Sequence, residues 1–174
     1  MGRTGKLLCS DHEEVKPDIL ILGKSLSGGF LPVSAILCDN HIMNHIKPGQ
    51  HGSTYGGNPL ACEVAIKSIE VTLEEKMVEN SAKMGDYLIE HLKKIFASHH
   101  LKEVRGKGLF VGAEFLESDI ANRLSQAMLK NGLIAKPTQR NIIRFSPPLI
   151  ITKTQIDDAV EIIDKSWKEV NKSL

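Results

Sequence analysis

The sequence has no marked excess of charge of either sign. Its 174 residues include 22 lysines and arginines against 21 aspartates and glutamates. This balance provides no basic field for a nucleic-acid backbone, and no lysine-rich amphipathic segment is present to lie on a membrane. No apolar run approaches the length of a membrane span, and the first residues lack the apolar region of a signal peptide. We therefore expect a soluble intracellular protein with no nucleic-acid or membrane partner.

Cysteine is scarce, which excludes two further classes of protein. Cys9, Cys38 and Cys62 are odd in number, far apart and outside any C-x-x-C spacing. The sequence therefore predicts neither a disulfide framework nor a zinc site. His41 and His45 have the i, i+4 spacing of a helical metal pair, but the glutamate of a zinc protease does not follow the first of them. We expect no metal site.

Repeats and low-complexity tracts are also absent, so the fold follows from ordinary strand and helix patterns. Short apolar runs at 19–23 and 33–38 predict two neighbouring strands of a parallel sheet that is covered on both faces. A helix is expected from Pro59 towards Leu73, because proline suits a first helical position and an apolar stripe follows it. Residues 74–76 interrupt that stripe, and we place a domain boundary near residue 76.

The second half of the chain alternates between strand and helix patterns in a different order. We expect a helix from Met77, strands near 104–107, 109–115, 133–136 and 142–145, a helix over 119–131 and a last helix after 152. That last helix opens with a capping box, Thr152 with Gln155, and its apolar stripe is expected to pack in the core. The order of elements predicts α/β structure in residues 1–76 and a small α+β domain in residues 77–174.

Lys24 is the candidate nucleophile. It stands directly after the first apolar run and before the bendable stretch Ser25-Leu26-Ser27-Gly28-Gly29. Ligands of open α/β sheets bind beyond the carboxyl ends of the strands, so an amine at this place would face a ligand. Partial burial would favour the neutral amine, which is the form that makes Schiff bases. The alternative is a surface lysine that extends its ammonium group into water.

The same residues match the end of a phosphate-binding loop. Gly23-Lys24-Ser25 spells its last three positions, but the motif needs a glycine five positions before Gly23, where Asp18 stands. It also needs a flexible loop before the lysine, whereas here an apolar run leads directly to Gly23. We therefore exclude a nucleotide-binding loop.

Two more polar residues lie in segments that suit anion binding. Arg144 lies within the apolar segment Ile142–Phe145, where a guanidinium must meet an anion and can grip a carboxylate with two parallel hydrogen bonds. A structural ion pair with an Asp or Glu of the fold explains Arg144 equally well. Thr54 offers a hydroxyl beside several glycine amides, which suits a phosphate, and the alternative is a threonine that stabilises a turn.

These three residues fall in the order and spacing of a known family. Asp18–Gly29 around Lys24, His51–Pro59 around Thr54 and Ile142–Pro148 around Arg144 resemble the class III, fold type I pyridoxal-phosphate aminotransferases. Within this family the chain most resembles the group that transaminates ornithine. That closer resemblance extends to Ile46–His51, Val104–Leu109 and Gly132–Pro137, and the match covers nearly the whole chain.

The resemblance implies a fold and an activity. Residues 1–76 would be the C-terminal part of the large pyridoxal-phosphate domain, and residues 77–174 the small domain. Lys24 would bind pyridoxal 5'-phosphate as a Schiff base and move the substrate proton. Thr54 would bind the phosphate, in this family in the site of the partner subunit of a homodimer or larger homo-oligomer. Arg144 would hold the substrate α-carboxylate.

The implied reaction moves the δ-amino group of ornithine to 2-oxoglutarate, giving glutamate semialdehyde and glutamate, in the cytoplasm or the mitochondrial matrix. The family's phosphate loop, its ring-stacking aromatic and the acid that pairs with the ring nitrogen would all precede Met1. We therefore expect the C-terminal portion of an aminotransferase, incomplete as an isolated catalyst. Two alternatives stay open: a class III enzyme with another substrate, such as acetylornithine or 4-aminobutyrate, and a non-catalytic chain that docks on intact subunits.

Overall fold

The computed structural model describes residues 1–172, which divide into two compact units. The first unit consists of Met1 and Leu8–Lys76. The second unit contains Gly2–Leu7 and the chain from Met77 onwards. No helix among the described residues is both long enough and apolar enough to cross a bilayer.

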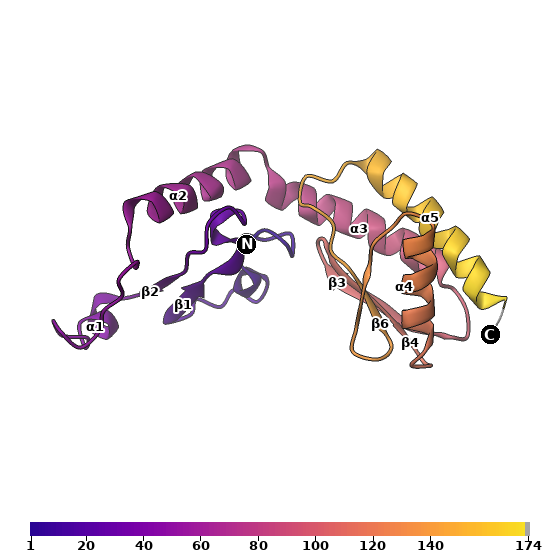
Figure 1. The fold of residues 1–174 in the computed structure, drawn as a ribbon, viewed down its shortest axis with the longest axis horizontal. Coiled ribbons are helices and arrows are strands. Elements are labelled where there is room, and N and C mark those ends of the chain that lie inside the picture. Colours follow the sequence, from indigo (N-terminus) through magenta and orange to yellow (C-terminus); the bar gives the residue numbers. More distant parts are fainter. Residues whose placement is uncertain (173–174) are drawn as a thin grey trace. The chain divides into compact units, whose positions relative to one another are not determined.

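The first unit is built from short elements and one long helix. In chain order these are the 3-10 helix η1 (Cys9–His12), β1 (Ile19–Leu22), the 3-10 helix η2 (Lys24–Ser27), β2 (Ala35–Cys38), α1 (Asn40–Met43) and α2 (Pro59–Glu74) (Figure 1). The predicted start of α2 is confirmed. Pro59 lies in its first turn, where no partner for a backbone N–H is needed, and Asn58 Oδ1 accepts a hydrogen bond from the Ala61 amide at 2.9 Å.

The two strands of this unit differ from their prediction. β1 and β2 form a two-stranded antiparallel sheet, with Ile19 opposite Cys38 and Leu22 opposite Ala35. The prediction of a parallel sheet covered on both faces is therefore wrong, and Ile21 is 72% exposed. The connection over residues 23–34 holds only η2 and reverses the chain direction, whereas a parallel pair needs a longer crossover. An apolar run predicts a strand but not what covers it.

The second unit is an α+β domain, as predicted. Its elements are α3 (Met77–Ile95), β3 (Leu101–Lys107), β4 (Phe110–Phe115), α4 (Ile120–Lys130), β5 (Lys136–Thr138), β6 (Ile142–Phe145) and α5 (Lys153–Asn171) (Figure 1). The strands form one antiparallel sheet in the order β3-β4-β6-β5. Strand β5 begins at Lys136 instead of near 133, because only residues 136–138 pair with β6.

One face of this sheet supplies the core. Val111, Ala113 and Phe115 alternate along β4 with residues of the opposite face, and each is 0–1% exposed. They pack with apolar residues of α3, α4 and α5 in a single hydrophobic cluster. Phe96, Phe115 and Trp167 meet at its centre, with ring centroids 5.3–5.5 Å apart. Helices therefore cover one face of the sheet, and the other face is available for a site.

The predicted last helix is confirmed. Thr152 Oγ1 accepts a hydrogen bond from the Gln155 amide at 3.3 Å, and Gln155 Oε1 accepts one from the Thr152 amide at 3.0 Å. The buried stripe of α5 includes Ile156, Ile163 and Trp167. The capping box thus fixes where the helix begins, and the stripe fixes which side faces the core.

The segment Gly2–Leu7 is held on the second unit by polar contacts. Ser81 Oγ of α3 donates to the Arg3 carbonyl at 2.8 Å and accepts from the Leu109 amide at 3.2 Å. The Arg3 guanidinium donates to the carbonyls of Leu109 and Pro147. Partial burial lowers the Arg3 pKa. This segment therefore bridges the turn after β3 and the loop after β6.

Candidate active site

Lys24 lies at the point where β1 ends and the chain turns sharply. Gly23 is extended, with φ −173° and ψ −163°, and Lys24 is the first residue of η2. The φ of Lys24 is 53°, in the left-handed region that residues with a side chain rarely adopt. Such strain persists only where the surrounding structure imposes it, and it is concentrated at functional sites. The Lys24 side chain is exposed, so the expected partial burial is not found among the described residues.

A cavity of about 1050 Å³ lies beside Lys24 within the first unit. Its lining combines Lys24 with Tyr55, Gly56, Gly57 and Asn58 and with apolar residues of β2 and α2. The amine thus borders a hollow that is large enough for a cofactor-sized molecule. None of the residues that line this cavity is an aspartate or a glutamate.

The loop before α2 is held by its own hydrogen bonds. Ser53 Oγ accepts from the Gly56 amide at 3.0 Å, and Asn58 Nδ2 donates to the Tyr55 carbonyl at 2.8 Å. Gly57 has φ 71°, a conformation that glycine adopts without strain. Thr54 is exposed at the tip of this loop and does not line the Lys24 cavity. The structure therefore brings Lys24 to residues 55–58 but not to Thr54 of the same chain.

Arg144 lies in the second unit, on β6. Its Nε atom is buried and has no hydrogen-bond partner among residues 1–172. A buried, unpaired guanidinium nitrogen is costly unless an anion reaches it. The structural ion pair that the sequence left open is not found among the described residues, which favours the reading of Arg144 as a ligand-binding residue.

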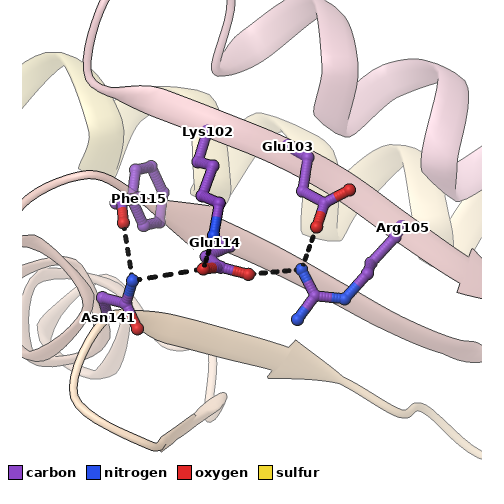
Figure 2. Close-up of polar contacts among 6 residues, drawn as sticks. All are labelled: Lys102, Glu103, Arg105, Glu114, Phe115 and Asn141. Carbon is purple, nitrogen blue, oxygen red and sulfur yellow. Dashed lines mark hydrogen bonds and ion pairs between the residues drawn. The ribbon is translucent and has the colours of Figure 1, made fainter.

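Other cations of the same sheet are paired, as Figure 2 shows. Lys102 Nζ lies 2.7 Å from one oxygen of Glu114, and Arg105 Nη1 lies 2.5 Å from the other and 2.5 Å from Glu103. Asn141 Nδ2 also donates to Glu114, at 3.4 Å. The hydrogen bonds from Lys102 and then from Arg105 lower the pKa of Glu114 to about 2. This network neutralises the cations at the β3 edge.

The residues beside Lys24 fit two parts of pyridoxal 5'-phosphate. An exposed amine at a cavity can condense with its aldehyde, and a loop of glycine amides and hydroxyls can take its phosphate. The ring nitrogen has no acidic partner in the cavity lining. Among residues 1–172, no three His, Cys, Asp or Glu side chains are placed to hold a metal ion. Helix α1 ends at Met43, so His41 and His45 do not share it.

Comparison with protein families agrees with this geometry. The model of the aminotransferase class-III family matches residues 1–166. The chain belongs to the class III aminotransferases. This aminotransferase chain is thus of the family that its lysine, threonine and arginine segments resemble.

Named relatives of this class III chain are ornithine aminotransferases. It is 54% identical over 166 residues to the probable mitochondrial ornithine aminotransferase of Caenorhabditis elegans, covering 95% of this chain and 39% of that protein. It is 51% identical over 166 residues to the mitochondrial ornithine aminotransferase of Drosophila melanogaster, covering 95% of this chain and 38% of that protein. The chain therefore spans about two fifths of the length of the curated relatives that it matches.

Solved structures share the fold. An ornithine aminotransferase from Toxoplasma gondii, described as having partial occupancy of PLP at its active site, has a TM-score of 0.93 and 41% identity, covering 99% of this chain and 42% of that one. An acetylornithine aminotransferase from Elizabethkingia anophelis has a TM-score of 0.91 and 50% identity, covering 97% of this chain and 45% of that one. The described fold is that of a pyridoxal-phosphate-dependent aminotransferase.

Sequence reasoning missed several residues of this aminotransferase chain. Tyr55 and Asn58 line the Lys24 cavity, but the sequence indicated only a glycine-rich turn there. Glu114 organises the network of Figure 2. The signal for Glu114 was a carboxylate inside the apolar run 109–115, which needs a cationic partner when it is buried.

Proposed function

We propose that this chain is the lysine-bearing portion of an aminotransferase that moves the δ-amino group of ornithine to 2-oxoglutarate, giving glutamate semialdehyde and glutamate. The observation that carries the proposal is the placement of Lys24, which has a strained backbone and borders a cavity of about 1050 Å³. The names of relatives that are 50% or more identical over 166–168 residues supply the choice of ornithine as donor.

Lys24 has two tasks in this proposal. It would hold pyridoxal 5'-phosphate, which supplies the electron sink for the reaction when bound. Its Nζ, as a free amine, would then accept the proton from the substrate carbon that bears the amino group and later return it. An exposed amine beside the cavity is free to reach both positions, because no hydrogen bond holds it elsewhere within residues 1–172.

The other two residues would fix the two ends of the reactants. Arg144 would bind the substrate carboxylate with its fork of N–H donors, which matches a carboxylate better than a lysine does. Thr54 would donate its hydroxyl to the cofactor phosphate of the partner subunit. Its position outside the Lys24 cavity supports a contribution to a second site and therefore a homodimer or larger homo-oligomer.

The test uses a chimera in which this chain replaces the 166 matching residues of the Drosophila melanogaster relative. We expect the chimera to produce glutamate semialdehyde from ornithine and 2-oxoglutarate. Lys24→Ala should lower its turnover by at least about a thousandfold, since a positioned acid–base group contributes up to about 10⁴-fold. Lys16→Ala, which removes an exposed lysine of the same unit, should leave turnover unchanged. Equal activity of the two variants would refute the role of Lys24.

A different amino donor is the first competing function. The similarity to an acetylornithine aminotransferase, at 50% identity, is the observation that favours it. Separate assays of the chimera with ornithine, acetylornithine and 4-aminobutyrate decide the question. A kcat/KM for either alternative donor above that for ornithine would overturn the proposed substrate.

A non-catalytic docking chain is the second competing function. It is favoured by the absence of an acidic residue from the Lys24 cavity, which leaves the cofactor ring nitrogen without a partner. Mixing the 174-residue chain with the intact Drosophila relative and measuring the mass of the complexes tests this function. If no mixed complex forms, the docking function is wrong.

We also propose the cytoplasm or the mitochondrial matrix as the location. Relatives from worm, fly and rat carry the word mitochondrial in their names. Fractionation of the source cells with an antibody against the second unit would show the compartment, and recovery of the protein with secreted material would contradict both locations.

A further inference from the structure

The cations of the second unit are unequally paired. Strand register places Arg105, Gly112, Arg144 and Lys136 in one row across β3, β4, β6 and β5, with their side-chain positions on the same face of the sheet. Arg105 is tied to Glu103 and Glu114, as Figure 2 shows. No side-chain hydrogen bond or ion pair is found for Lys136 or Arg144 within residues 1–172. The unpaired positive charge therefore gathers on β5 and β6.

Lys136 and Arg144 border the same cavity, which has a volume of about 390 Å³. Directly opposite residues of paired antiparallel strands have Cβ atoms only about 5 Å apart. The cavity lining contains no aspartate or glutamate. Two like charges this close, with no carboxylate of the fold between them, call for an anion from outside.

The rest of the lining indicates what kind of anion fits. Apolar side chains make up most of the wall, among them Leu133, Ile134 and Phe145. Gly112, on the other side of Arg144, contributes no side chain that could fill the row. Charged groups beside an apolar wall suit a ligand with two anionic ends joined by methylene groups. A compact dianion such as phosphate would leave that wall without a partner.

We propose that Lys136 is a specificity-determining residue that binds the second carboxylate of an aliphatic dicarboxylate whose first carboxylate is held by Arg144. The inference rests on the proposed function, in which Arg144 grips a substrate carboxylate. It adds a reason for preferring a dicarboxylic oxo acid to a monocarboxylic one. Lysine serves here as a point charge with three donors, and arginine as the planar fork that fixes orientation.

The test is a titration of the 174-residue chain with glutarate and with pentanoate, which have the same number of carbons but two and one carboxylates. The signal is the NMR resonance of the Arg144 Nε–H group, which lacks an acceptor and should shift when a carboxylate reaches it. We expect both ligands to shift it, with glutarate about fivefold tighter, as one exposed charge pair allows. That advantage should shrink as salt is added.

Three variants separate the possible outcomes. Lys136→Met should weaken glutarate about fivefold and leave pentanoate unchanged. Lys107→Met, which removes one positive charge from the β3 side of the same sheet, should change neither. Arg144→Lys should weaken both ligands, because a lysine cannot form the parallel pair of hydrogen bonds.

The result that would overturn the inference is an unchanged preference for glutarate in Lys136→Met. The carboxylate role of Arg144 would survive that result. Failure of both ligands to shift the Arg144 resonance would remove that role as well, and with it this part of the proposed function. Inorganic phosphate that competes as strongly as glutarate would show a site for compact dianions and contradict the dicarboxylate assignment.

Discussion

Glu114 is held by more partners than any other carboxylate in Figure 2, and this gives it a pH signature. Its pKa falls to about 2 in the folded chain, chiefly because Lys102 and Arg105 donate hydrogen bonds to it. The unfolded value is about 4.3. A lowered folded pKa adds stability above the unfolded pKa, and that stability is lost as the pH falls towards 2.

We therefore predict a difference between the wild type and Glu114→Gln that depends on pH. Thermal unfolding followed by circular dichroism should show a less stable variant at pH 7, because Lys102 and Arg105 lose their anion. The gap should narrow between about pH 5 and pH 2 as the wild-type carboxylate is protonated. Melting curves that stay equally far apart over this range would contradict the assigned pKa.

Ser81 is the residue on which the N-terminal segment depends. It is fully buried, and it serves the Leu109 amide and the Arg3 carbonyl at once. Ser81→Ala should cost about 1–3 kcal/mol of unfolding free energy, because a buried amide is left without an acceptor. Urea titration measures this cost. The exposed Ser118→Ala is the control, and equal midpoints for the two variants would show that the contact contributes nothing.

At the level of elements, two glycines set how closely α3 approaches the turn after β3. A Cβ atom built on Gly85 would lie 2.1 Å from the Gly108 carbonyl oxygen. Gly85→Ala should therefore destabilise the second unit by about 1–3 kcal/mol through overpacking. This exceeds the gain of roughly 1 kcal/mol that alanine brings to a helix interior.

The control for that substitution is Gly52→Ala, where an added Cβ has no neighbour within 4 Å. Differential scanning calorimetry should show a lower melting temperature for Gly85→Ala and little change for the control. A Gly85→Ala variant as stable as the wild type would mean that α3 and the turn can move apart freely.

Helices were more predictable from the sequence than strand pairing. Pro59 after Asn58, and Thr152 with Gln155, specify local hydrogen bonds, so the starts of α2 and α5 were found correctly. The β1 run predicted a strand, but its partner direction depends on how residues 23–34 turn. Local chemistry fixes a cap, whereas pairing and covering depend on residues distant in the sequence.

The candidate site was predicted in the same uneven way. Lys24, Thr54 and Arg144 were all chosen from local context, and the structure supports Lys24 by its strained backbone and Arg144 by its unpaired Nε. Lys136 was not singled out, because only strand register reveals that it stands opposite Arg144. A row of charges across a sheet has no signature in a single segment of sequence.

At the scale of the whole molecule, the two units differ in how much core each contains. The large hydrophobic cluster begins at Met84 and lies entirely within the second unit. The first unit buries few residues, and its two-stranded sheet exposes Ile19, Ile21 and Ile36 by half or more. A two-stranded sheet with little cover is marginally stable.

We predict that the 174-residue chain alone exchanges its amide hydrogens unevenly. Mass spectrometry should find β4 and α4 protected for longest, and β1 and β2 exchanged early, because local opening is easiest where few apolar contacts are lost. In the chimera, β1 and β2 should gain protection if the rest of the relative covers them. Equal protection of both units in the isolated chain would contradict this ranking.

The central claim is that the amine of Lys24 carries the cofactor. The most direct measurement is borohydride reduction of the chimera after incubation with pyridoxal 5'-phosphate, followed by peptide mapping. We predict a single pyridoxyl adduct, on Lys24, and none in the Lys24→Ala variant. A chimera that transfers amino groups while its adduct lies on another lysine, or on none, would contradict the account.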